Sequence, residues 1–133
     1  MKYMNKSIEE LHELLISGKV TSEELVKESL EAAHCVNEKL NAFVTIIDDA
    51  KAAKVTEDLL SGIPYAVKDN YATKGILSTG SSNTLKDYVP FFDATVVEKL
   101  KKAGTINVGK TVLDELEKAS NCKKWVDVCK EGE

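Results

Sequence analysis

Apolar and polar positions in the first half of the chain repeat at helical spacing in two stretches. Ser7 and Thr21 each begin a capping box, with a glutamate three residues later and apolar residues behind it. The pattern predicts a first helix that ends at Ser17-Gly18 and a second helix that runs to about Asn37. Residues 42–47 are apolar and β-branched, which predicts a short strand.

The second half alternates helical stretches with compact apolar runs. Asp48 is predicted to cap a helix over residues 50–60, and Asp93 a helix over residues 94–103 that Gly104 ends. Residues 63–67 and 105–108 are predicted to be interior strands, residues 71–90 a loop with one helical turn, and residues 112–118 a helix. The alternation predicts an α/β layer structure over residues 1–118, followed by a divergent tail over residues 119–133.

Charge and composition narrow the class of protein. The net charge of the 133 residues is −4, and all 18 basic residues are lysine. Because phosphate and guanine recognition draws on the arginine fork, we expect no direct nucleic-acid binding. The chain has neither an apolar run long enough for a membrane span nor an N-terminal signal core, so we expect a cytoplasmic protein without membrane contact. Cys35, Cys122 and Cys129 form no CxxC pair, which argues against a disulfide framework and a zinc site.

Residues 104–111 (Gly-Thr-Ile-Asn-Val-Gly-Lys-Thr) satisfy the Walker A pattern of a phosphate-binding loop. Such a loop follows a strand and curls its backbone N–H groups around phosphate. Here a helix is predicted before Gly104, and the four residues between the glycines are strand-like. We therefore expect a helix cap, a strand and a strand-to-helix turn, and keep nucleotide binding as the less favoured alternative.

Lys68 lies at the end of the predicted strand over residues 63–67. Side chains alternate across a sheet, so Pro64, Ala66 and Lys68 share one face, and the small neighbours leave space beside the amine. A buried lysine at such a place can become a neutral base. A solvated lysine at a strand end instead discourages aggregation, and the pattern alone favours this second reading.

The stretch Gly62-Ile-Pro-Tyr-Ala-Val-Lys68-Asp-Asn70 closely resembles the lysine motif of the amidase-signature family. Residues 89–100, 104–110 and 113–115 resemble later segments of that family, in the same order and with natural spacing. Residues 7–31 and 40–44 are most similar to one branch, the A subunit of glutamyl-tRNA(Gln)/aspartyl-tRNA(Asn) amidotransferase. The resemblance implies a partial amidase-signature fold, with N-terminal helices and a few strands of a mixed sheet.

The resemblance also implies a Lys–Ser–Ser triad to which this sequence contributes Lys68. Neutral lysine acts through a bridging serine to activate a nucleophilic serine, which attacks the amide of glutamine. The resemblance implies that the ammonia passes to a B subunit that uses ATP and Mg²⁺, and that a small C subunit binds both the A and B subunits. No cofactor is therefore expected on this chain. Keeping Lys68 neutral at pH 7 costs roughly 4.6 kcal/mol from a pKa near 10.4, which requires a dry pocket.

The glycine-rich stretch that holds both serines in the family has no counterpart in this sequence. Gly80-Ser81-Ser82 corresponds by its order to a loop just beyond the lysine strand, and these serines are expected to cap a turn near Thr84. We therefore expect no amide hydrolysis by the isolated chain, and marginal stability or self-association through exposed strand edges. A partner would be the remainder of an amidase domain. The alternatives are a binding or regulatory module on an amidase partner, and the nucleotide binder described above.

Overall fold

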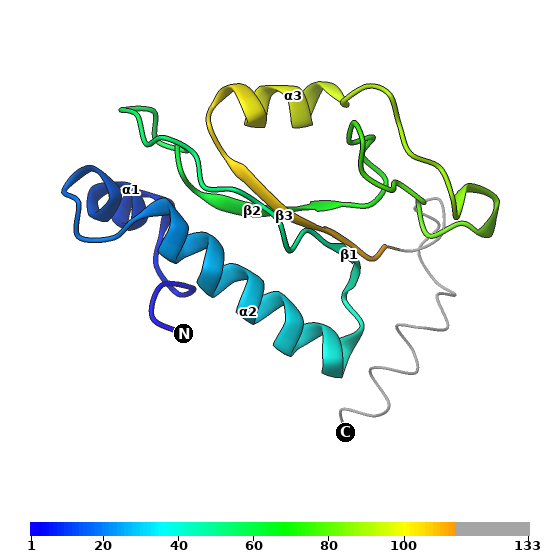
Figure 1. Ribbon diagram of the computed structural model, residues 1–133, viewed down its shortest axis with the longest axis horizontal. Helices are drawn as coiled ribbons and strands as arrows, with labels where there is room; N and C mark the ends of the chain where they lie inside the picture. Colours follow the sequence, from blue (N-terminus) through cyan, green and yellow to red (C-terminus); the bar gives the residue numbers. More distant parts are fainter. Residues whose placement is uncertain (114–133) are drawn as a thin grey trace.

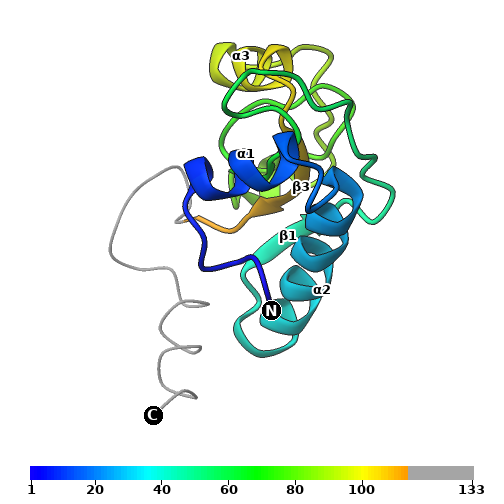
Figure 2. The ribbon, with the colours of Figure 1, turned by 90° about the vertical axis from the view of Figure 1, so that its left-hand side faces the viewer.

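The computed structural model describes residues 1–113, which form a small sheet between two layers of helix and loop. Helix α2 runs along one face of the sheet, and α3 lies over the other face (Figure 1). The view from the side shows the same order of layers, with α1 beside the first turns of α2 (Figure 2). The elements are α1 (Ile8–Ile16), α2 (Ser22–Leu40), β1 (Phe43–Ile46), β2 (Pro64–Lys68), the 3-10 helix η1 (Asn83–Leu85), α3 (Thr95–Lys102) and β3 (Ile106–Thr111).

The sheet is mixed, in agreement with the predicted fold class. Strand β3 is central, antiparallel to β1 and parallel to β2. Between β2 and β3 the register shifts, because Tyr65 faces Asn107 whereas Ala66 faces Gly109. Val108 is therefore an extra residue on β3, as in a β-bulge. Within the described sheet β2 is an edge strand, although the sequence pattern predicts an interior one.

Both predicted capping boxes are present at the starts of the first two helices. The side chains of Ser7 and Thr21 each accept a hydrogen bond from the backbone N–H of a glutamate three residues later. The side chain of that glutamate accepts a hydrogen bond from the backbone N–H of the capping residue. The first helix ends before Gly18, as predicted. Helix α2 is three residues longer than expected and ends at Asn41, which adopts the left-handed conformation.

Two apolar clusters hold the helices against the sheet. The first joins α1, the start of α2 and the residue before β2, and the second joins the middle of α2 to β3. Burial of side chains of this size supplies most of the free energy of folding in a small domain. The buried members are Leu15, Val20, Leu25 and Ile63 in the first cluster, and Val26, Ile106 and Val108 in the second.

The helix predicted over residues 50–60 is wrong, because this segment is irregular throughout. Ala50 and Ala53 pack on the second cluster, whereas Val55 packs on the first. The irregular segment therefore contributes apolar side chains to both clusters. Asp48, the expected cap, instead places Oδ1 2.5 Å from His34 Nε2 on α2.

Asp93 was expected to cap the next helix, and this prediction is also wrong. Helix α3 begins after Ala94, which provides no side-chain cap. The Asp93 carboxylate instead accepts hydrogen bonds from Lys74 N and Lys101 Nζ, both at 2.7 Å. Asp93 thus ties the loop after β2 to the last turn of α3, a tertiary role that local sequence does not reveal. Gly104 follows the helix with a positive φ of 82°, as predicted for its stop.

We expect Asp93→Asn to reduce the acid sensitivity of the fold. Burial acts to raise the pKa of Asp93, but the Lys101 ammonium and the Lys74 N–H outweigh it, so the pKa lies below its ordinary value. A lowered pKa gives stability above the unfolded pKa of about 3.9 that is lost as the pH falls through the folded-state pKa. Because Lys101 is nearly half exposed, the loss at pH 7 should be at most about 1 kcal/mol. Melting temperatures at pH 7 and near pH 3 test this, and an equal difference at both would contradict it.

Strand β3 extends beyond its predicted end to Thr111, because β1 and β2 pair with it on both sides. Of the predicted helix over residues 112–118, Val112 and Leu113 lie in no helix. The rest of that prediction and the tail over residues 119–133 lie outside the described residues. None of the helices in residues 1–113 is long and apolar enough to cross a membrane.

Candidate functional site

Two lysines lie near the carboxyl ends of the parallel strands, and the sheet places them on opposite faces. Lys68 is the last residue of β2, and its backbone partner on β3 is Thr111. Lys110 pairs with Val67, so its side chain shares the face of Val67 and not that of Lys68. Lys68 is exposed, whereas the Lys110 side chain is completely buried.

The surroundings of Lys68 agree with the alternation predicted for its strand. Val67 is buried, while Ala66 and Lys68 are exposed on the other face. Tyr65 lies on the same face as Val67, where burial and then the charge of Asp93 raise the pKa of its hydroxyl. The side of β2 that carries Lys68 therefore combines a small neighbour, Ala66, with an exposed lysine.

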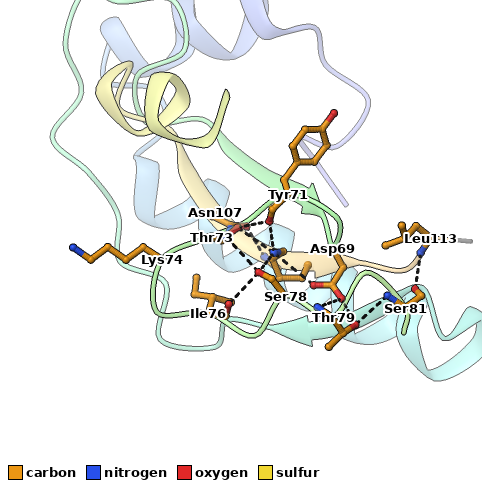
Figure 3. Close-up of polar contacts among 12 residues, drawn as sticks. Asp69, Tyr71, Thr73, Lys74, Ile76, Ser78, Thr79, Ser81, Asn107 and Leu113 are labelled. Carbon is orange, nitrogen blue, oxygen red and sulfur yellow. Dashed lines mark hydrogen bonds and ion pairs between the residues drawn. The ribbon is translucent and has the colours of Figure 1, made fainter. Parts of the chain in front are cut away.

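The Lys110 ammonium is enclosed by four oxygen atoms. Nζ donates to Ser78 Oγ at 2.7 Å, to Tyr71 O at 2.8 Å and to Thr73 Oγ1 at 3.0 Å. Asp69 Oδ1 lies 3.5 Å from the same nitrogen, and both side chains are fully buried. Figure 3 shows these groups converging from the loop that follows β2. We call Lys110, Asp69, Thr73, Ser78 and Thr79 the lysine cage.

The hydroxyl groups of the cage are arranged to accept hydrogen bonds from a charged Lys110. Thr73 Oγ1 donates its own proton to Tyr71 O, and Ser78 Oγ donates to Ile76 O. Each hydroxyl oxygen therefore faces Lys110 as an acceptor, and an ammonium has three protons to donate. Burial lowers the pKa of Lys110 below its ordinary value, and the neighbouring Asp69 carboxylate opposes this shift.

Asp69 is held on all sides by the chain around it. Its Oδ2 accepts hydrogen bonds from Thr79 N at 3.0 Å and from the Thr79 hydroxyl. Its backbone N–H donates to Thr111 O, and its carbonyl accepts from Gly80 N. Oδ1 has no hydrogen-bond partner, so the Lys110 charge is what compensates this buried oxygen.

The Walker A pattern falls on this central strand. Gly109 and Lys110 are paired in register with β1 and β2, so the backbone between the glycines is extended, as predicted. Lys110 is directed into the lysine cage and has no exposed surface. The predicted turn into a helix after this strand falls mainly outside the described residues.

The hydroxyl groups of Ser81 and Ser82 both accept hydrogen bonds from backbone N–H groups. Ser82 Oγ accepts from Thr84 N and caps η1, as predicted. Ser81 does not cap this turn, because its Oγ accepts from Leu113 N at 3.4 Å. Ser81 also has a positive φ of 57°, a conformation that costs an L-residue about 1 kcal/mol or more.

Sequence reasoning missed the lysine cage. It treated Lys110 only as a possible phosphate ligand and assigned no role to Asp69. A usable signal was present, since a lysine within the apolar run of β3 needs buried acceptors, and the loop after β2 is rich in hydroxyl side chains. Within residues 1–113, no group of three or more His, Cys, Asp or Glu is arranged to hold a metal ion.

Comparison with known sequences shows that this chain is similar to amidases. The family model described as Amidase matches residues 24–126. The A subunit of the glutamyl-tRNA(Gln) amidotransferase of Lactobacillus acidophilus is 42% identical over 124 residues, covering 91% of this chain and 26% of that protein. Its counterpart in Lacticaseibacillus paracasei is 44% identical over 130 residues, covering 91% and 27%. The chain thus spans about a quarter of the length of these curated relatives.

Solved structures agree with the sequence comparison. The A subunit of the glutamyl-tRNA(Gln) amidotransferase of Thermotoga maritima superimposes with a TM-score of 0.72 at 36% identity, covering 84% of this chain and 24% of that one. The peptide amidase of Stenotrophomonas maltophilia shares the fold, with a TM-score of 0.76 at 22% identity over 86% of this chain and 26% of that one. The lysine motif on β2, the matching family model and the shared fold together show that this chain belongs to the amidase family.

Proposed function

We propose that this chain provides the lysine of a glutamine-hydrolysing amidase site, as part of the A subunit of an aminoacyl-tRNA amidotransferase. The observation that carries the proposal is the contrast between the two lysines. Lys110 is buried and donates its protons inside the lysine cage, whereas Lys68 is exposed at the carboxyl end of β2 beside Ala66. In the proposed site, the remainder of the amidase domain covers Lys68 and supplies the dry pocket that a neutral amine requires. The identity of 42% to the Lactobacillus acidophilus protein supports the choice of branch.

In the proposed reaction, neutral Lys68 takes a proton through a bridging serine from the nucleophilic serine. The serine oxygen attacks the side-chain amide carbon of glutamine, and the amide nitrogen leaves as ammonia after it has gained a proton. Water then hydrolyses the acyl-enzyme to glutamate and the free serine. Both serines belong to a part of the amidase site that these 133 residues do not contain.

The chain alone is therefore proposed to be inactive. A nucleophile, its base and the relay between them act as a unit, so one member without the others retains little of the rate. We assign ammonia transfer, ATP and Mg²⁺ to a B subunit, and contact between the two large subunits to a small C subunit. We assign no cofactor to this chain, and we place the assembly in the cytoplasm.

The test is a chimera in which residues 7–113 replace the matching segment of the Lactobacillus acidophilus A subunit within its amidotransferase. The chimera is expected to release ammonia from glutamine, and Lys68→Met should lower kcat at least about 10³-fold. Lys68→Arg should be equally impaired, because a guanidinium does not become neutral. Lys102→Met, at an exposed site on α3, is the matched control and should leave the rate unchanged.

Two outcomes would contradict the proposal. One is full glutamine hydrolysis by the Lys68→Met chimera. The other is glutamine hydrolysis by the isolated 133-residue chain that survives Lys68→Met, which would place the chemistry on other residues.

A further inference from the structure

We infer that the buried pair of Lys110 and Asp69 is a strut that positions Lys68. The inference rests on the proposed function, since it gives the lysine cage a role in presenting the amidase lysine. Asp69 follows Lys68 directly in the chain and is joined to the central strand through Lys110 Nζ, 3.5 Å from Oδ1. Neither residue would touch the substrate, so each is a positioning residue.

The anchor of the strut is Lys110. It lies on β3, between β1 and β2, so its backbone is held by pairing on both sides. Its ammonium binds Tyr71 O, Thr73 Oγ1 and Ser78 Oγ, three groups of the loop that follows β2. The loop is thus fastened to the most constrained strand of the sheet.

The other end of the strut is Asp69, one residue beyond β2. Its carboxylate is shared between Lys110 and Thr79, and its backbone is bonded to Thr111 and Gly80. Within the described sheet β2 is an edge strand, and Lys68 is its last residue. A terminal residue of an edge strand opens locally unless the chain beyond it is held. Asp69 supplies that hold.

Strand geometry converts this hold into a direction for Lys68. Consecutive side chains of an extended chain point to opposite faces. Because the carboxylate of Asp69 is drawn into the lysine cage on one face, the Lys68 side chain must leave the sheet on the other. The same contact limits rotation of the Lys68 backbone, and with it the range of positions open to the amine.

A charged pair suits this task better than an apolar contact. Apolar residues of similar volume often stabilise a core at least as well as a buried ion pair does, so overall stability alone does not account for this pair. An ammonium with three fixed acceptors and one carboxylate has a single favourable arrangement. The strut is therefore expected to affect local order at Lys68, beyond any effect on overall stability.

The test compares backbone order in the full 133-residue chain by ¹⁵N relaxation. Under conditions in which they remain folded, Asp69→Asn and Lys110→Met should lower the order parameter of the Lys68 amide from about 0.85 to below about 0.6, while amides of α2 stay unchanged. Thr79→Val keeps both charges and removes one donor to Asp69, so it should give a smaller decrease and remain folded. Lys102→Met on α3 is the control and should change nothing at Lys68.

An unchanged order parameter at Lys68 in folded Asp69→Asn and Thr79→Val would overturn the strut, even if both variants melted at lower temperature. Glutamine hydrolysis by the chimera distinguishes failure of the strut hypothesis from failure of the proposed function. If the strut acts on Lys68, Asp69→Asn should lower kcat for glutamine at least about 10-fold with KM unchanged. Loss of order at Lys68 in a chimera that still hydrolyses glutamine after Lys68→Met would leave the strut standing and overturn the proposed function.

Discussion

Gly109→Ala is expected to destabilise the fold by about 3 kcal/mol or more, a large share of the stability of a small domain. An added Cβ would lie 2.7 Å from Phe43 Cδ1 and 2.8 Å from the backbone oxygen of Thr45. The Phe43 ring could move, but the Thr45 oxygen belongs to β1, which pairs with β3 at this point. The added methyl group therefore forces the two strands apart.

Gly18→Ala is the matched control for this substitution. Gly18 has a φ of +70° and no atom within 4 Å of the position of an added Cβ. Only the cost of the left-handed conformation remains, about 1–2 kcal/mol. Urea denaturation followed by far-UV circular dichroism measures both variants. A smaller loss for Gly109→Ala than for Gly18→Ala would contradict the close contact between β1 and β3.

Lys110→Met and Asp69→Asn are each expected to cost about 3–5 kcal/mol, because each leaves the other member of a buried ion pair uncompensated. The double variant removes both charges together. Its cost should be smaller than the sum of the single costs by about 1–3 kcal/mol, the range seen for residues in direct contact. Urea denaturation at pH 7 gives the free energies of unfolding of the unchanged chain, the two single variants and the double variant, which together form a double-mutant cycle.

Additive costs in this cycle would show that the two charges do not interact. Thr79→Val provides an internal comparison, because it removes a neutral donor from the same carboxylate and should cost about 1 kcal/mol. If either single charge variant fails to fold while the double variant folds, the coupling is confirmed directly.

Features of the fold that depend on a few consecutive residues are predicted well from the sequence. The capping boxes at Ser7 and Thr21 are complete within four residues, and both helices begin where they indicate. Three local predictions, the caps at Asp48 and Asp93 and the helix over residues 50–60, were wrong because distant contacts decide these places. Aspartate is a common helix cap, but the carboxylates of Asp48 and Asp93 instead contact His34 and Lys101. Residues 50–60 form an irregular segment that packs on both apolar clusters.

In the candidate site too, features that depend on neighbouring residues are predicted from the sequence, and features that depend on distant residues are not. The place of Lys68 at a strand end, and the small residue beside it, follow from alternation within one strand. The lysine cage does not, because its members come from β3 and from the loop after β2, more than thirty positions apart. The Walker A pattern concerns only the local order of residues and contains no information on this enclosure. The catalytic role of Lys68 stays a prediction.

The extra residue on β3 sets the direction of Lys110. Ile106 and Lys110 are four positions apart, so in an unbroken strand both would point the same way. Their partners on β2 are Pro64 and Val67, which point opposite ways, and the difference arises at Val108. If β3 kept all its residues but ran without the bulge, Lys110 would point the same way as Ile106, toward helix α2. The enclosure of Lys110, in contrast to the exposure of Lys68, thus depends on one unpaired residue in a single strand.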